Sequence, residues 1–256
     1  GLLSIAAVLG MASGPRDASA ANLCWVAPNQ FPYDIGNGYL TEAYCPGGNA
    51  CGCEIYGTNC LVKLANNVTA TNANTGGSVC LKLGSGVTFD LDGKSMTCSG
   101  TDCGRAVYNT SSGASSSKVV VKNGTISGCF DAGLSFDASG GANTNSSVSD
   151  MTVSLGSGCS NGLLYSNNEL FNVGISSPHG LISRVIVSNT DIGVVGNTGA
   201  DLEDSILRDN VAAMLTNVGV IDNVLFENND YHLWKYKGSY DPDISGSTFL
   251  GGAGDC

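Results

Sequence analysis

The sequence predicts an all-β solenoid of about seven coils, in which short strands stack in parallel. The composition favours strands over helices, because Glu, Lys, Gln and Arg are scarce, 36 of the 256 residues are glycine and only 13% are charged. Val, Ile, Thr and Asn recur, which is typical of short strands separated by turns. A repeated spacing favours a solenoid: "KNGTISGCFDAGLSF" (122–136) and "SRVIVSNTDIGVVG" (183–196) share few identities but keep one rhythm.

Three aligned columns define this repeat, and a further short strand such as "LSF" or "HLW" follows each unit. The first apolar column is Leu91, Val121, Val148, Ile182, Leu202, Ile221 and Ile244. The second is Met96, Ile126, Val153, Val187, Leu207, Phe226 and Phe249. Between them lies a turn-like column of Gly93, Asn123, Asp150, Arg184, Asp204, Asn223 and Gly246. We expect both apolar columns to point inward and to stack at a rise of about 4.8 Å per coil.

Two stretches carry a resemblance to a known fold family. "VTFDLDGKSMTCSG" (87–100) and "VVVKNGTISG" (119–128) resemble the opening coils of right-handed parallel β-helix repeat proteins of the pectin-lyase-like superfamily. The resemblance covers roughly residues 80–250 and implies a right-handed parallel β-helix. It also implies, as candidates, the activities of that superfamily, which includes pectate lyases, polygalacturonases, epimerases and phage tailspike hydrolases. One fold hosts many functions, so the activity must be argued from residues.

The catalytic motifs that the resemblance implies are incomplete. The polygalacturonase pattern is Asn-Thr-Asp, then Asp-Asp, Gly-His-Gly and Arg-Ile-Lys. Here Asn189-Thr190-Asp191 matches the first element, but no Asp-Asp follows, "PHG" (178–180) precedes it and Arg-Ile-Lys is absent. We therefore expect a non-catalytic member, in which 189–191 is a turn.

Eleven cysteines indicate a disulfide-bonded protein from an oxidising compartment, extracellular or at the cell surface. Zinc sites usually combine CxxC pairs or nearby histidines, whereas this chain has Cys51-x-Cys53 and two distant histidines. The odd number leaves one thiol free or bonded between chains. The cysteines are Cys24, Cys45, Cys51, Cys53, Cys60, Cys80, Cys98, Cys103, Cys129, Cys159 and Cys256.

Coil stacking predicts two disulfides. Cys129 and Cys159 precede equivalent strands of adjacent coils, and one coil rise lies within the Cα separation of about 4.4–6.8 Å that a disulfide tolerates. We expect Cys129–Cys159, with Cys98–Cys103 as a local pair. The remaining N-terminal cysteines would staple a cap over the first coil. The predicted organisation is therefore an apolar arm (1–20), a cysteine-rich cap (21–80) and the β-helix (81–256).

The net charge of −11, with no cluster of Lys and Arg, argues against nucleic acid as a partner. The apolar run from Leu2 to Ala12 is too short to span a bilayer. It precedes Ala18-Ser19-Ala20, a small-residue cleavage pattern. Residues 1–20 are therefore either the remnant of an export signal or a retained apolar arm, and no stable membrane span is predicted.

The candidate catalytic cluster is Asp150, Arg184 and Asp204, which share the turn column beside Lys122 and Glu203. On a rigid sheet these groups could abstract a proton from a uronate. The alternative is a charge-balanced ladder on a solvent-exposed face. The loops 138–147 and 166–180, the second carrying His179, would wall a groove beside the column.

No cofactor and no metal site are predicted. A weak calcium site at Asp201, Glu203, Asp204 and the "DPD" of 241–243 stays an option, whereas "DLDG" (90–93) lacks the later ligands of a calcium loop.

An aromatic cluster marks the penultimate coil. "YHLWKYKGSY" (231–240) contains Tyr231, Trp234 and Tyr236 in a chain with only 7% aromatic residues. Such residues cap solenoid ends, form interfaces or stack on sugars. We expect a secreted structural solenoid that forms a surface or filament subunit by head-to-tail self-association. The alternatives are a polysaccharide lyase or hydrolase acting on acidic glycans, or a non-catalytic carbohydrate-binding β-helix.

Overall fold

The computed structural model describes residues 23–27, 33–34, 38–40, 51–75, 79–109, 118–136, 146–156, 159, 163–165, 169–176, 180–196, 200–216, 219–235 and 242–252. Within these residues the only helix is one short turn, α1 (Asn72–Thr75), so the all-β prediction is confirmed. The strands form sheets of ten, fifteen and two strands. The two-stranded sheet is an antiparallel pair, β14 (Leu163–Tyr165) and β15 (Glu169–Phe171).

The ten-stranded sheet is parallel from its third strand to its last. In spatial order it contains β2 (Tyr33–Asp34), β1 (Leu23–Ala27), β4 (Cys53–Thr58), β7 (Val79–Leu83), β10 (Arg105–Asn109), β12 (Ala132–Phe136), β16 (Val173–Ser176), β19 (Ile192–Gly196), β22 (Ala212–Thr216) and β25 (Tyr231–Lys235).

The fifteen-stranded sheet is parallel throughout and bends at the turn column. One arm contains β3 (Gly38–Leu40), β5 (Cys60–Leu64), β8 (Val87–Asp90), β11 (Val120–Gly128), β13 (Ser147–Ser154), β17 (Leu181–Ser183), β20 (Asp201–Glu203), β23 (Val220–Asp222) and β26 (Asp243–Ser245). The second arm contains β6 (Val68–Ala70), β9 (Ser95–Cys98), β18 (Ile186–Ser188), β21 (Ile206–Arg208), β24 (Leu225–Glu227) and β27 (Thr248–Leu250), and joins the first through β11 and β13.

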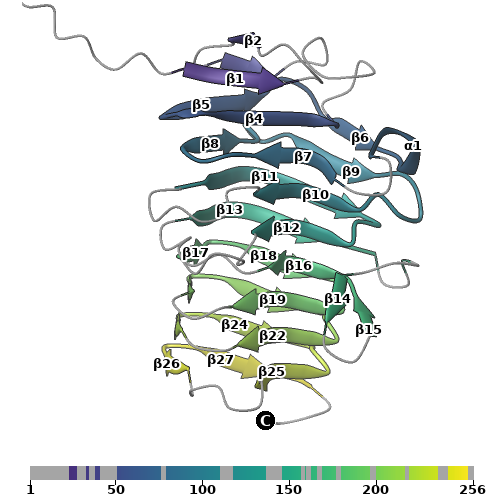
Figure 1. Cartoon of the computed structure of the whole chain (residues 1–256). Helices are drawn as coiled ribbons and strands as arrows, with labels where there is room; N and C mark the ends of the chain where they lie inside the picture. The colour runs from purple at the N-terminus through teal and green to yellow at the C-terminus, as the bar shows by residue number, and fades with distance from the viewer. Residues whose placement is uncertain are drawn as a thin grey trace, which may run out of the picture.

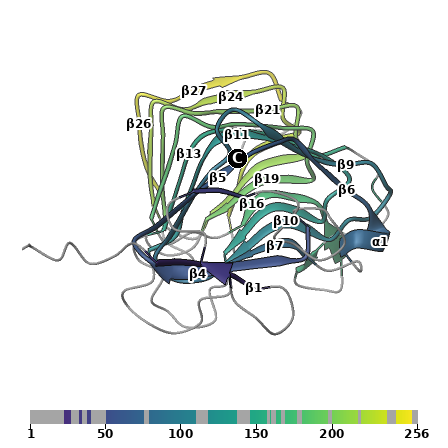
Figure 2. The same ribbon diagram turned by 90° about the horizontal axis from the view of Figure 1, so that it is seen from above.

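The chain moves from one end of a stack to the other, alternating between the two large sheets (Figure 1). Seen along the stack, strands of successive layers overlie one another (Figure 2). The larger apolar core lies between the sheets, and its largest buried side chains include Phe89, Phe130 and Phe226. A second, smaller cluster contains Ala132, Val173, Ile192 and Val195. Parallel sheets of this kind are compatible with a β-solenoid.

The predicted register holds along the second apolar column. Met96, Ile126, Val153, Val187, Leu207, Phe226 and Phe249 pair in that order on adjacent strands. The first column also holds from Val121 to Ile244.

The first member of the first column differs from the prediction by two residues. Val121 pairs with Phe89, not with Leu91. The turn after β8 is two residues longer than its counterparts, and both Asp92 and Gly93 are left-handed there, with φ of 51° and 74°. Leu91 is still buried, but it lies in the turn rather than in the strand.

The cysteine-rich segment contributes strands to both large sheets. β4 pairs in parallel with β7, and β5 pairs in parallel with β3 and β8, so the parallel stack extends into residues 21–80. Within the described part of this segment, the antiparallel pairs are β1–β2 and β1–β4, and they lie at the N-terminal end of the stack. Disulfides Cys24–Cys60 and Cys51–Cys80 fasten this end, with Cα separations of 5.0 and 4.0 Å.

Candidate functional site

The turn column forms a line of left-handed residues at the bend of the fifteen-stranded sheet. Asn123, Asp150, Arg184, Asp204 and Asn223 have φ between 48° and 62°. Glycine, asparagine and aspartate adopt this conformation at low cost, which explains their use in successive turns. Arg184 is the exception, and it lies between β17 and β18 with φ of 52°.

Arg184 and Asp150 form a bidentate ion pair across adjacent layers. Arg184 Nε donates to Asp150 Oδ1 at 2.6 Å and Nη2 donates to Oδ2 at 2.9 Å. Both side chains are about half exposed. Asp204, one layer further on, accepts a hydrogen bond from Asn223 Nδ2 at 2.8 Å instead. The structure therefore stacks the three predicted residues, but pairs only two of them.

The electrostatics of this cluster favour a structural role. The hydrogen bond from Arg184 lowers the pKa of Asp150, and the same contact raises the pKa of Arg184. A carboxylate with both oxygens held by a guanidinium is a weak proton acceptor, and a guanidinium of raised pKa does not give up its proton at neutral pH. The cluster thus consists of one exposed ion pair, Arg184–Asp150, and a neighbouring carboxylate, Asp204, that is hydrogen-bonded to Asn223.

The neighbouring charged residues are also committed to structural contacts. Lys122 Nζ lies 3.7 Å from Asp90 Oδ2. Asp90 Oδ1 accepts from the backbone N–H of Asp92 at 2.8 Å and from Asn123 Nδ2 at 3.1 Å, so "DLDG" is a strand and turn. Asp201 Oδ1 accepts from the backbone N–H of Val220 at 3.1 Å. No group of three or more His, Cys, Asp or Glu side chains suited to a metal occurs among the described residues.

The two predicted disulfides are present. Cys129 and Cys159 are bonded with a Cα separation of 5.3 Å, as expected. The premise that they precede equivalent strands is wrong, because the strand after Cys159 is β14, which pairs with β15, whereas β12 pairs with β16. Cys98 and Cys103 form the local pair at 5.9 Å. His179 and residues 138–145 lie outside the described residues. The expectation that 166–180 is a loop is wrong, because this range contains β15 and β16, and β16 is a strand of the ten-stranded sheet.

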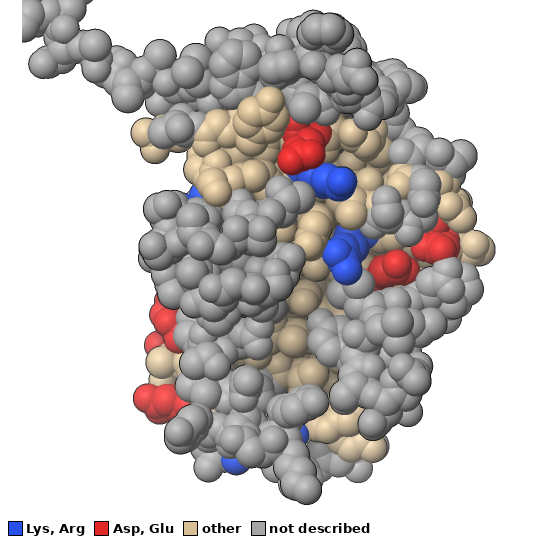
Figure 3. Space-filling view, in the orientation of Figure 1, with Lys and Arg blue, Asp and Glu red and all other residues tan. Residues whose placement is uncertain are grey.

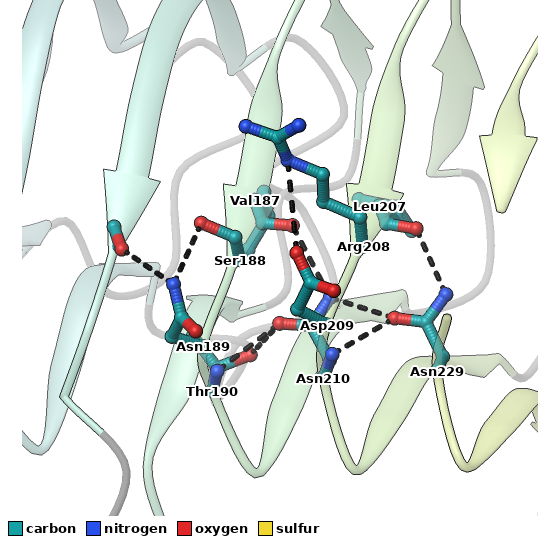
Figure 4. A network of polar contacts seen from close by, with 10 residues as sticks. Val187, Ser188, Asn189, Thr190, Leu207, Arg208, Asp209, Asn210 and Asn229 are labelled. Atoms are coloured by element: carbon teal, nitrogen blue, oxygen red, sulfur yellow. Dashed lines mark hydrogen bonds and ion pairs between the residues drawn. The ribbon is translucent and has the colours of Figure 1, made fainter. Parts of the chain in front are cut away.

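Asn189-Thr190-Asp191 forms a turn, as expected, and begins a buried polar stack that sequence reasoning missed (Figure 4). Thr190 donates through its backbone N–H and its hydroxyl to Asn210 Oδ1, at 3.1 and 2.7 Å. Asn210 donates through N–H and Nδ2 to Asn229 Oδ1, both at 3.0 Å. The side-chain nitrogens of Asn210 and Asn229 also donate to the backbone oxygens of Val187 and Leu207.

A sequence signal for this stack exists. "NT" (189–190), "DN" (209–210) and "NN" (228–229) fall at the same offset after the second apolar column. The second residue of each dipeptide is buried, whereas the first is exposed and left-handed. The repeated offset distinguishes a stacked amide from an isolated turn residue.

The aromatic cluster lies on β25, the last strand of the ten-stranded sheet. Tyr231 and Trp234 are 53% and 45% exposed, with ring centroids 6.3 Å apart. Phe171 of β15 meets Trp234 edge-on at 6.4 Å. Tyr236 lies outside the described residues.

The two apolar columns end on an exposed layer. Ile244 and Phe249 are each 41% exposed, although their partners Ile221 and Phe226 are fully buried. The expectation that Ile244 and Phe249 are interior residues is therefore wrong, because among the described strands β26 pairs only with β23 and β27 only with β24. Of the ten large apolar residues that are exposed in the described part of the chain, five lie on the three terminal strands: Tyr231, Trp234, Ile244, Phe249 and Leu250.

On the face drawn in Figure 3, described side chains of both charge signs occur, without a single-sign patch. No helix in the described part of the chain is long and apolar enough to cross a membrane. Comparison with known protein families, with curated proteins and with solved structures finds no match to this chain. Function must therefore be argued from the geometry of the molecule itself.

Proposed function

We propose that the chain is a right-handed parallel β-helix of the pectin-lyase-like kind, secreted, and that it serves as a structural subunit which self-associates through its C-terminal layer. The parallel stacking supports the β-helix, and right-handed crossovers are the rule for parallel strands. The disulfides support an oxidising environment outside the cell.

One observation is the main support for the proposal: the last residue of each apolar column, in the terminal layer, is exposed. Ile244 and Phe249 continue the lines of Ile221 and Phe226, and only a layer with apolar residues at the same spacing would cover both. Among the described strands, none pairs with the outer edges of β25, β26 and β27, and unpaired edges favour pairing with another chain. A second copy offers apolar residues at this spacing from Phe89 and Met96 onward, and its end strands offer edges for pairing.

We propose that the contact is head-to-tail, with the N-terminal end of the next copy covering the terminal layer. Such a heterologous contact does not close on itself, so it yields a filament. Residues 1–22, which include the apolar arm, lie outside the described residues. Deletion of residues 1–20 would test whether the arm contributes to the contact.

Assembly of the full chain tests the proposal directly. Light scattering after size-exclusion chromatography should show a mass that rises with concentration, and negative-stain microscopy should show filaments. Phe249→Asp combined with Leu250→Asp should give monomers, because two charges on the contact layer would lose their hydration. Leu181→Asp is the matched control, since Leu181 is 38% exposed on β17, away from the terminal layer.

A wild-type chain that stays monomeric at its highest soluble concentration would overturn self-association. A discrete dimer that does not grow would overturn the head-to-tail geometry, because a dimer requires a two-fold contact.

Carbohydrate binding is the second candidate, favoured by the exposed rings of Tyr231 and Trp234. Aromatic faces of this kind stack on sugar rings. Affinity electrophoresis in polygalacturonate or alginate should then show retardation that Trp234→Ala removes and that Tyr56→Ala, a half-exposed tyrosine of β4, leaves unchanged.

The lyase or hydrolase alternative rests on Asp150, Arg184 and Asp204. Incubation with the same uronans and calcium should give no unsaturated product. Product formation that Arg184→Ala abolishes would replace the structural proposal with an enzymatic one.

A further inference from the structure

The sequence contains four sites of the pattern Asn-x-Ser/Thr without a proline in the middle, the pattern at which N-linked glycans are attached in exported proteins. They begin at Asn67, Asn109, Asn123 and Asn145. In a chain rich in Asn, Ser and Thr the pattern also recurs by chance. The folded structure therefore decides which of these side chains has room for a bulky, hydrated glycan. The first three asparagines lie within the described residues.

Burial excludes the site at Asn109. This residue is the last of β10 and is only 1% exposed. It pairs in register with Leu83 and Phe136 of the neighbouring layers, and both of these are buried. A glycan on Asn109 has no room in this sheet, so the folded chain leaves Asn109 unmodified.

Asn123 is exposed, but its side-chain nitrogen is in use. Nδ2 donates to Asp90 Oδ1 at 3.1 Å, and Asp90 is only 6% exposed. The residue is also held in the left-handed conformation of the turn, with φ of 62°. A sugar on Nδ2 would crowd a nearly buried carboxyl group, so the structure disfavours this site.

Asn67 has neither obstacle. It lies in the turn between β5 and β6 and is exposed, as is Thr69, the third residue of the pattern. Asn67 Oδ1 accepts the backbone N–H of Ser95 at 3.0 Å, whereas Nδ2 has no hydrogen-bond partner among the described residues. An N-linked glycan leaves the amide oxygen unchanged. The contact with Ser95 therefore persists in the modified chain.

We propose that Asn67 carries an N-linked glycan, an inference that rests on the export proposed above. In the transfer, a bond forms between Asn67 Nδ2 and the anomeric carbon of the first sugar, and the bond from that carbon to the diphosphate of a lipid-linked oligosaccharide breaks. The proton that Nδ2 loses leaves with the released lipid diphosphate. The disulfides support the compartment of this reaction, because they form in the oxidising lumen of the secretory pathway.

Secretion of the full chain from a eukaryotic host, behind an export signal of that host, tests the site. Peptide mapping of the disulfide-bonded protein in the medium should find a glycan on most copies of Asn67 and none on Asn109. Peptide-N-glycosidase should remove the glycan from Asn67. An unmodified Asn67 in secreted protein with these disulfides intact would overturn the inference and leave export standing. Retention of the wild type and of every variant inside the cell would overturn both.

Thr69→Val is the decisive variant. It removes the hydroxyl that the transfer requires, but it keeps Asn67, the contact with Ser95 and a β-branched residue in β6. The glycan at Asn67 should be lost, whereas Thr69→Ser, which restores a hydroxyl, should retain it. Thr125→Val, the matched change in the pattern of Asn123, should leave the glycan at Asn67 unchanged. A glycan that Thr125→Val removes and Thr69→Val does not would place the modification at Asn123 and overturn the assignment.

Discussion

At the scale of single residues, the left-handed turn positions decide which side chains form the exposed corner. Glycine, asparagine and aspartate fill nearly all of these positions, because only they adopt positive φ at low cost. The polar column that resembles an acid–base cluster is therefore a consequence of backbone geometry. Among the described non-glycine residues with positive φ, Arg184 is the only one that is neither Asn nor Asp. The ion pair with Asp150 offsets part of the cost of this backbone conformation.

Replacing Arg184 by asparagine tests this account. Arg184→Asn removes an exposed ion pair of small value and relieves a left-handed arginine, so the free energy of unfolding should stay unchanged or rise slightly. Arg184→Val, which keeps neither the pairing nor a tolerance for positive φ, should destabilise the chain clearly. Urea denaturation of both variants measures the difference. A large decrease in the free energy of unfolding of Arg184→Asn would show that the ion pair with Asp150 contributes more stability than the relief of the left-handed backbone.

The buried carboxyl of Asp131 should make stability depend on pH. Its pKa in the folded chain, about 6, lies above the ordinary value of 3.8. Its contribution to stability is therefore fully present below about pH 3.8 and is lost as pH rises through 6. Asp131→Asn and the wild type should be similarly stable at pH 4, and the variant should be more stable at pH 7.5. A pH-independent difference would contradict the shift, and Asp230→Asn, at an exposed carboxylate just before β25, is the control.

At the scale of strands and turns, most of the apolar register could be predicted from the sequence. The second column holds from Met96 to Phe249 because its residues sit at one fixed distance from each turn. The error at Leu91 arose where the turn gains two residues, which leaves the apolar alternation intact and so gives no signal. Exposure of Ile244 depends on whether another layer covers it, and the local pattern does not encode that.

The first apolar column offers a matched pair of substitutions, one in its interior and one in its last layer. Leu202→Ala should cost about 2–5 kcal/mol, because Leu202 is fully buried between Ile182 and Ile221 and the cavity would persist. Ile244→Ala, in the same column but in the exposed last layer, should cost about 1 kcal/mol or less. Chemical denaturation of the monomeric Phe249→Asp/Leu250→Asp background avoids a contribution from assembly. Equal costs would mean that the terminal layer is covered in solution.

The buried amide stack should tolerate little change. Asn210→Asp replaces a donor by an acceptor against the oxygens of Val187 and Asn229, and buries a charge, so several kcal/mol should be lost at pH 7. Asn189→Asp, at an exposed and left-handed position one layer earlier, should change stability little. Thermal melts of the two variants compare an amide that is part of the stack with one that is not. Similar melting temperatures would indicate that the stack adds no stability.

At the scale of the whole molecule, stability should follow position along the stack. Each layer contacts mainly its two neighbours, so local opening spreads from the ends. The disulfides between described cysteines all lie between Cys24 and Cys159, at the N-terminal end and middle of the stack. Beyond β16 the layers depend on apolar columns and the amide stack.

Hydrogen exchange measured by mass spectrometry should reveal this gradient. In the monomeric background, backbone amides of β26 and β27 should exchange first, those of β23 to β25 next, and those of β8, β11 and β13 last, because the terminal layer has one neighbour and exposed apolar residues. Reduction of the disulfides should speed exchange in the N-terminal layers and flatten the gradient. In the self-associated wild type, protection of β26 and β27 should rise toward that of the interior strands. Uniform exchange at one rate would instead mean that the stack opens as a single cooperative unit.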